Sequence, residues 1–316
     1  MKRTTIALRV AMLLALALPA ASASAQKKRH YSEDDRDPSR GIDTTLAFDR
    51  RGVVNVSIPS GEIIVTGWDK DQVRVHATSE DAGVRVSATS YRITIELASA
   101  RRSGDARIEV SVPQGVRVSA RAQSGDISVR GTKGAVEAVT QSGDIAVEDV
   151  ADRVDVNSLS GDVEVSQVNG DVEAKSTSGD VSVTDVQGGG EITIETVSGE
   201  ITVKEAVAKV FRGHSVSGDV TYEGAIDPQG RYELSAHSGE IRLGVQKEIG
   251  AQISVSTWSG TVESDFPIIL KPGEHGIGSA SAKRFNFEVG NGAARITLES
   301  FSGDITINSN SRSRKE

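Results

Sequence analysis

The sequence predicts an all-β protein built as a single β-solenoid domain, and three observations lead to this prediction. A corner motif of Ser, Gly and Asp or Glu recurs along most of the chain, at intervals of 18 to 21 residues in its central part. Between the corners, aliphatic and polar residues alternate with a period of two, which is typical of strands. No segment keeps the period of a helix, so we expect strands throughout.

The first 25 residues have the pattern of a secretory signal peptide. Lys2 and Arg3 precede an apolar run over residues 10–21, and the small residues of 23–25 form a cleavage site. The run is too short to span a bilayer, and no later segment reaches that length. We therefore expect export, to the periplasm or the extracellular cell surface, and no transmembrane segment in the mature chain.

The repeats are flanked by two polar segments. Residues 26–44 are expected to form a disordered charged spacer, because nine of the first fifteen are charged and none of those fifteen is aliphatic. Residues 309–316 are expected to form a polar tail. The solenoid domain is accordingly predicted to span residues 45–308.

Charge and cysteine content exclude several classes of partner and bond. The chain has 36 Lys and Arg residues against 44 Asp and Glu, and three of the basic residues lie in the signal peptide. The mature chain would therefore carry 33 basic residues and a net charge of −11, which disfavours nucleic acid and anionic membranes as partners. There is no cysteine, so no disulfide can form.

The repeat can be read residue by residue in its central units. Residues 154–165, 172–183 and 192–203 align as two short strands joined at a glycine corner, and a half-way turn follows each unit. The corner glycines are Gly125, Gly143, Gly161, Gly179, Gly199, Gly218 and Gly239, with related corners at 61, 104, 260 and 303. Each unit of about 18–21 residues would be one coil.

An antiparallel meander and a solenoid share this spacing. A meander would leave one apolar face of its sheet uncovered, whereas a solenoid coil encloses its own core. We favour the solenoid, and a right-handed one from the twist of strands, although a left-handed three-sided coil also has about 18 residues. Open ends of such a stack could pair two copies.

One aliphatic position per coil is expected to form a continuous ladder inside. Its members are Ile127, Ile145, Val163, Val181, Ile201, Val220 and Ile241. A second aliphatic residue, such as Val168, follows each second strand by three residues.

The corner acids have two interpretations. Gly, Ser and Asp are the ordinary residues of a tight turn, so a structural role accounts for them. Stacked carboxylates could also bind cations, but the calcium-binding β-roll pattern matches poorly, and we expect no metal and no cofactor. The acids in question are Asp126, Asp144, Asp162, Asp180, Glu200, Asp219 and Glu240.

Catalytic patterns are weak in this chain. The five histidines are scattered without metal-ligand spacing, and the GHSVS segment at 213–217 lacks the last glycine of a nucleophile elbow. Acids recur in every coil, whereas a catalytic pair is a singular feature. We therefore expect no enzyme, and keep a carbohydrate-active enzyme on this scaffold as the alternative.

The residue before each corner serine becomes aromatic toward the C-terminus. His237, Trp258 and Phe301 occupy this position in the last coils. We favour a cap of the solenoid end, and the alternative is an exposed platform that stacks on sugars or on a partner protein.

Four segments resemble a known family. They are SIPSGEIIVTGWDKDQVRV (57–75), IEVSVPQGVRVSARAQSGDISVRG (108–131), YELSAHSGEIRLGV (232–245) and ITLESFSGDITI (296–307). Together they resemble the bacterial "putative adhesin" β-repeat domain family of unknown function, itself similar in pattern to the head domain of some auto-transporter adhesins. The resemblance implies an exported, solenoid-like protein without assigned catalytic residues.

These observations favour a non-catalytic scaffold or adhesin-like binding module of the cell envelope or surface. Its partner would be an envelope protein or a glycan. A partner-binding component of an envelope stress response is a third alternative.

Overall fold

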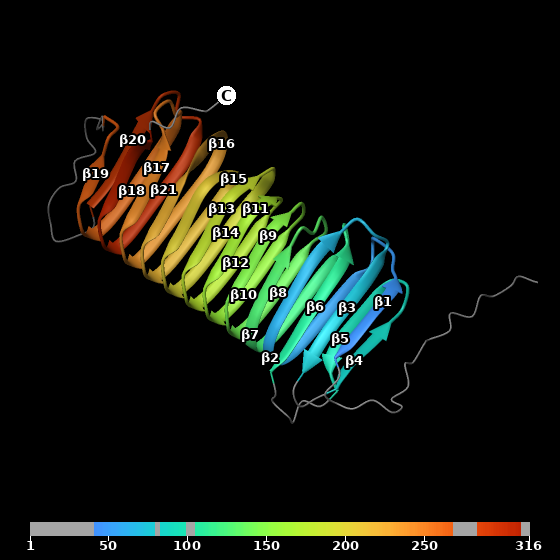
Figure 1. Cartoon of the computed structure of the whole chain (residues 1–316). Coiled ribbons are helices and arrows are strands. Elements are labelled where there is room, and N and C mark those ends of the chain that lie inside the picture. The colour runs from blue at the N-terminus through green and yellow to red at the C-terminus, as the bar shows by residue number, and fades with distance from the viewer. Residues whose placement is uncertain (1–40, 80–82, 99–104, 268–282, 311–316) are drawn as a thin grey trace, which may run out of the picture.

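The computed structural model describes residues 41–79, 83–98, 105–267 and 283–310, which form strands and turns without a helix (Figure 1). The strands are β1 Ile42–Ala47, β2 Val53–Trp68, β3 Gln72–Ser79, β4 Val84–Ala88, β5 Arg92–Leu97, β6 Ala106–Pro113, β7 Arg117–Arg130, β8 Val136–Ser142, β9 Ile145–Val150, β10 Val154–Ser160, β11 Val163–Asn169, β12 Val172–Ser178, β13 Val181–Gln187, β14 Gly189–Ser198, β15 Ile201–Ser217, β16 Val220–Ser238, β17 Ile241–Gln246, β18 Ala251–Ser259, β19 Val262–Ser264, β20 Lys283–Val289, β21 Ala294–Ser302 and β22 Ile305–Asn310. The predicted signal peptide lies outside these residues.

Successive coils stack by parallel pairing in two walls, so the predicted solenoid is confirmed. In the first wall β8, β10, β12 and β14 follow one another, and Val154 lies between Val136 and Val172. In the second wall β9, β11, β13 and β15 do the same, and Val163 lies between Ile145 and Val181. A meander would instead pair the two strands of one coil in antiparallel fashion. The handedness of the coil stays a prediction.

The predicted inner ladder lies inside the solenoid. All seven of its members are at most 1% exposed, from Ile127 to Ile241. The column continues through Ile63 at one end and Ile305 at the other, because these residues pair with Ile127 and Ile241. Each buried aliphatic side chain contributes roughly 1.5 to 3 kcal/mol to folding.

A bulge in each coil turns one more aliphatic residue inward. Val168 is 1% exposed although it follows the inward Val165 by three positions, where strict alternation would require two. The extra residue is Gln167, whose φ of 54° lies in the left-handed region. Pairing with β13 skips Gln167 and resumes at Val168. Equivalent left-handed residues are Asp149, Asp185 and Glu205.

Replacing this bulge residue by glycine is expected to stabilise the protein. Left-handed backbone costs a non-glycine residue about 1–2 kcal/mol, which exceeds the entropy that glycine loses on folding. We expect Gln167→Gly to raise the free energy of unfolding by up to about 1 kcal/mol in urea titrations. The matched control Ser166→Gly, in ordinary strand conformation, should lower it by about 0.5–1 kcal/mol. A loss in both variants would contradict the role given to the bulge.

The order of coils departs from the order of the chain at both ends. At the N-terminal end β2 lies between β7 and the strands β5 and β6. At the C-terminal end β21 is inserted between β16 and β18, and β22 between β17 and β19. The expectation that consecutive coils always stack is therefore wrong there. The corners are chemically alike, so the repeat itself does not determine which coil stacks on which.

Antiparallel strands complete both ends of the stack. β1 pairs with β3 and β3 with β6, β4 pairs with β5, and β20 pairs with β18. β1 starts at Ile42, three residues inside the predicted spacer, because it alternates and pairs with β3. β22 likewise extends two residues into the predicted tail, to Asn310.

Candidate functional site

The glycine corner is held by backbone and hydroxyl contacts between neighbouring coils. The N–H of Gly161 donates to the carbonyl of Ser178 at 3.1 Å, and the hydroxyl of Ser176 donates to the Gly161 carbonyl at 3.3 Å. The same buried hydroxyl contact to a corner carbonyl recurs along the stack, at Thr140, Ser158, Thr196, Ser215, Thr257 and Ser300. The first residue of the sequence S/T-x-S-G thus links neighbouring coils through a hydrogen bond.

The corner acids, defined as the seven candidate residues from Asp126 to Glu240, lie in one column beside these glycines. Oδ1 of Asp144 accepts the backbone N–H of Asp162 at 2.9 Å, and Oδ1 of Asp162 accepts that of Asp180 at 2.8 Å. Asp126, Asp180 and Asp219 make the same contact to the next corner acid. Each aspartate therefore satisfies a backbone donor of its neighbour, as a capping residue does.

The two glutamates in the column are held differently because their side chains are longer. Glu200 accepts the hydroxyl of Thr202 at 3.0 Å, and Glu240 accepts that of Thr306 at 3.3 Å. Arg242 pairs with both Asp219 and Glu240. Among the residues that the structure describes, no group of three His, Cys, Asp or Glu side chains is arranged to hold a metal ion.

The residues that precede the corner serines form an exposed column, which we call the stripe. Leu159, Val197, Val216, Phe301 and Trp258 belong to it and are 52%, 47%, 36%, 50% and 51% exposed. Thr177 and His237 complete it between Leu159 and Trp258 and are also exposed.

Three rings stack at the C-terminal end of the stripe, and we call them the aromatic ladder. The ring centroids of His237 and Phe301 are 4.8 Å apart with 8° between the planes, and those of Phe301 and Trp258 are 6.0 Å apart with 9°. Phe301 is central because β21 lies between β16 and β18. The rings lie on the outer surface, so the favoured interpretation as an end cap is wrong. Phe266 and Phe287, which the sequence did not single out, are the buried aromatic residues of the last coils.

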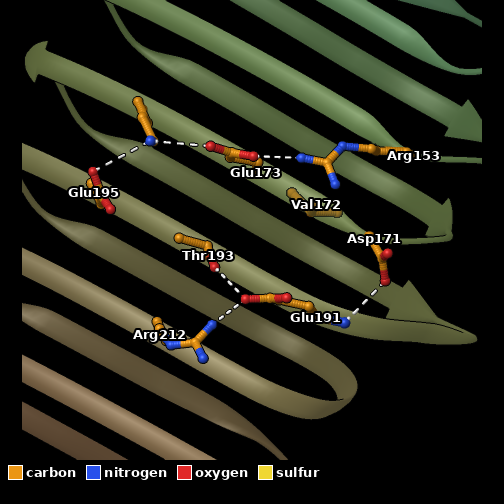
Figure 2. Close-up of a pocket in the computed structure, with 9 residues that line it drawn as sticks. Arg153, Asp171, Val172, Glu173, Glu191, Thr193, Glu195 and Arg212 are labelled. Carbon is orange, nitrogen blue, oxygen red and sulfur yellow. Dashed lines mark hydrogen bonds and ion pairs between the residues drawn. The ribbon is translucent and has the colours of Figure 1, made fainter.

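A shallow hollow of about 340 Å³ lies on the outer side of the first wall (Figure 2). Its charges are paired with one another across neighbouring strands. Glu173 contacts both Arg153 and Lys175, Lys175 also reaches Glu195 at 3.6 Å, and Arg212 contacts Glu191. The carboxylate of Asp171 accepts the backbone N–H groups of Gly190 and Glu191 at 2.8 and 3.0 Å. The residues that line the hollow therefore form a network of ion pairs across the strands, and this network connects neighbouring coils.

The ionised form of Asp155, which lies beside this network, is destabilised by its surroundings. Burial, followed by the neighbouring Glu173 carboxylate, raises the pKa of Asp155 above its ordinary value of 3.8. Asp155 lies directly between Glu137 and Glu173 in the strand register. The raised pKa means that the ionised carboxylate weakens the fold above that pKa, and that this penalty disappears below pH 3.8.

We therefore expect Asp155→Asn to be more stable than the parent protein at pH 7. The gain should vanish as the pH falls below the ordinary pKa of the free aspartate carboxyl, because Asp155 of the parent protein is then protonated in both the folded and the unfolded state. Urea unfolding at pH 7 and pH 3.5 would measure it. Glu164→Gln, on the exposed outer side of β11, serves as the control and should change neither value. A gain at pH 7 that persists unchanged at pH 3.5 would refute the electrostatic cause.

The segment that resembles a nucleophile elbow is structural. Ser215 is fully buried, and its hydroxyl donates to the Gly199 carbonyl at 3.2 Å. The neighbouring His214 contacts the hydroxyl of Ser235 through Nδ1 at 2.7 Å on the outer wall. A substrate could not reach the Ser215 hydroxyl without opening the coil.

Comparisons with known proteins give a family match and distant likenesses to solved structures, two of which are described here. The family model "Toastrack DUF4097" matches residues 42–229. A crystal structure of a "putative cell adhesion protein" from Clostridium sporogenes aligns with 8% identity and a TM-score of 0.26, covering 86% of this chain and 100% of that chain. A "putative adhesin" from Bacteroides fragilis aligns with 13% identity and a TM-score of 0.38, covering 85% and 98%. No curated protein matches.

In the described part of the chain, no helix has the length and apolar character needed to cross a bilayer.

Proposed function

The chain belongs to the Toastrack DUF4097 family, and we propose that it acts as a non-catalytic, exported binding module of the cell envelope. The stripe is the binding surface in this proposal, with the aromatic ladder at its C-terminal end. The solenoid serves as the rigid support that holds the stripe in place.

The observation that carries the proposal is the concentration of exposed apolar side chains in one column. Seven large hydrophobic residues are exposed among the described residues, and five of them lie in the stripe. Only Tyr91 and Val207 lie elsewhere. Large apolar side chains that gather on a surface mark interaction sites, whereas scattered ones do not.

A non-catalytic role is supported by the way the acids are used. The corner aspartates occupy one equivalent place in coil after coil, and each accepts a backbone N–H group of the next coil. Glycoside hydrolysis instead uses two carboxyl groups in different environments, with pKa values pushed apart. Export is supported by the signal-peptide pattern of residues 1–25, and both the periplasm and the cell surface are compatible with it.

The proposal is tested by locating the protein and mapping its contacts in cells. A photo-crosslinking amino acid is placed at Val216 in the stripe, and at Val207 as the matched control, since these two valines are 36% and 39% exposed. We expect the tagged chain in the periplasmic or surface fraction, with a discrete crosslinked product from position 216 and none from position 207. A chain confined to the cytoplasm, or equal crosslinking at both positions, would overturn the proposal.

A further inference from the structure

We infer that the stripe binds a basic polypeptide segment carrying aliphatic or aromatic side chains, and this inference rests on the proposed binding function. The partner is identified by three properties of the surface. They are the way the rings of the aromatic ladder are presented, the charge beside the stripe, and the length of the stripe.

The aromatic ladder offers ring edges to a partner. Phe301 lies between His237 and Trp258 in nearly parallel planes, at centroid distances of 4.8 and 6.0 Å, so its two faces are directed at its neighbours. Phe301 is nevertheless 50% exposed, although a neighbouring ring stacks on each of its faces. A sugar that stacks on an aromatic residue needs an open ring face. Ring edges carry partial positive charge and instead pack against aliphatic groups or the faces of other aromatic rings, which a polypeptide supplies.

The charge beside the stripe selects a cationic partner. The corner acids lie three residues beyond the stripe residues, across the glycine corner. Within the described part of the chain, Asp162 and Asp180 form no ion pair, and the Oδ1 atom of each accepts a backbone N–H group of the next corner acid. On the opposite side of the stripe Lys175 is already paired with Glu173 and Glu195. An uncompensated row of carboxylates attracts basic segments and repels acidic ones.

The same row of charges disfavours a second copy of this chain as the occupant. Two stripes that packed face to face and ran in opposite directions would bring two columns of corner acids close together, and like charges at that distance repel. A basic segment neutralises the column instead.

The length of the stripe sets the size of the segment. From Leu159 to Trp258 the stripe crosses six strand spacings of about 4.8 Å, or roughly 29 Å. About nine residues in extended conformation or about nineteen in a helix cover that length.

The test titrates the whole mature chain with a labelled 20-residue peptide of leucine and lysine, followed by fluorescence anisotropy. We expect Phe301→Ser to weaken binding at least tenfold. The matched control is Tyr91→Ser, because Tyr91 is 58% exposed at the other end of the molecule, and it should leave binding unchanged. A peptide of serine and lysine should bind at least tenfold more weakly than the leucine peptide, and a peptide of leucine and glutamate should not bind.

A second variant tests the charge without disturbing the corner. Asp162→Asn combined with Asp180→Asn removes two charges, while the amide oxygen of each asparagine can still accept the backbone N–H that each aspartate accepts. We expect weaker binding of the leucine and lysine peptide and a smaller dependence on salt, with an unchanged melting temperature. If the double variant binds as the parent does, the corner acids do not select the partner and the inference fails.

Two other outcomes identify a different occupant. Oligosaccharide binding that Phe301→Ser abolishes, in the absence of peptide binding, would replace the basic segment by a glycan and leave the proposed binding function intact. Sedimentation as a dimer that Phe301→Ser dissociates would replace it by a second copy. The proposed function itself fails only in the separate crosslinking experiment at Val216.

Discussion

Val163→Asp is expected to prevent the protein from folding. Val163 is 1% exposed and lies between the aliphatic residues Ile145 and Val181 in the inner ladder. Removing the valine forfeits roughly 1.5 to 3 kcal/mol of burial. Burying an ionised carboxylate costs several kcal/mol more, and the sum approaches the whole stability of a typical domain, about 5–15 kcal/mol. The measurement is soluble yield together with the thermal melting transition.

The control for this variant places the same charge one strand away on the outside. Ala146 follows Ile145 on β9, is exposed, and lies beside Glu164 in the register. Ala146→Asp should therefore cost only the few tenths of a kcal/mol of a like-charge pair on a strand surface. If Val163→Asp melted like the parent protein, the side chain at 163 would not face a closed interior.

The central coils could be predicted from the sequence because their information is local. Alternation fixes which side chains point inward, and the constant spacing places like residues above one another. Val154, Val172 and Ile192 follow from these two rules alone, and the structure places them in one column. The bulge at Gln167 left a trace in the sequence, since Val168 follows Val165 by three residues, although the left-handed backbone that causes this spacing was not anticipated.

A wide coil in the later part of the solenoid could not be predicted in this way. Here Tyr222 lies between Phe211 and Tyr232 inside the solenoid, with ring centroids 4.7 and 5.5 Å apart. The Tyr232 hydroxyl donates to the carbonyl of Ala208 at 2.7 Å, and Tyr222 approaches the carbonyl of Ala225 at 3.2 Å. An aromatic residue at an inward position shows that the coil is larger. It does not show how the chain path changes to hold it.

The sequence singled out the three residues of the aromatic ladder but did not indicate that their rings stack on one another. The column position of His237, Trp258 and Phe301 follows from the corner motif, but their contact depends on β21 lying between β16 and β18. That order is a long-range choice among chemically similar corners. The alternation of polar and apolar residues along a strand carries no information about the order in which strands stack. Phe301 could therefore not be placed at the centre of the aromatic ladder from the sequence.

Gly161→Ala is expected to separate two coils, because the corner leaves no room for a side chain. A Cβ atom at Gly161 would lie 2.0 Å from the carbonyl oxygen of Gly143, and the φ of 144° is one that other residues rarely adopt. Relief requires the coils to move apart, which breaks the Gly143–Ser160 hydrogen bond of 2.9 Å and the Asp162–Asp144 contact of 2.9 Å. Backbone strain of 1–3 kcal/mol and about 1 kcal/mol for each lost bond together suggest a loss of about 3 kcal/mol or more.

The matched control for that variant is a glycine near the start of β14, two coils further along the stack. A Cβ atom at Gly190 would meet its nearest atom, Oδ1 of Asp171, at 3.4 Å, which is an ordinary contact. Gly190→Ala should therefore change the free energy of unfolding in urea by less than about 1 kcal/mol, whereas Gly161→Ala should lower it severalfold more. Equal effects of the two substitutions would mean that any glycine-to-alanine substitution in the solenoid lowers the free energy of unfolding, whatever the space around the glycine. A selective loss at Gly161 would mean that close contact between stacked corners is what holds neighbouring coils together, and therefore what keeps the rings of the aromatic ladder at stacking distance.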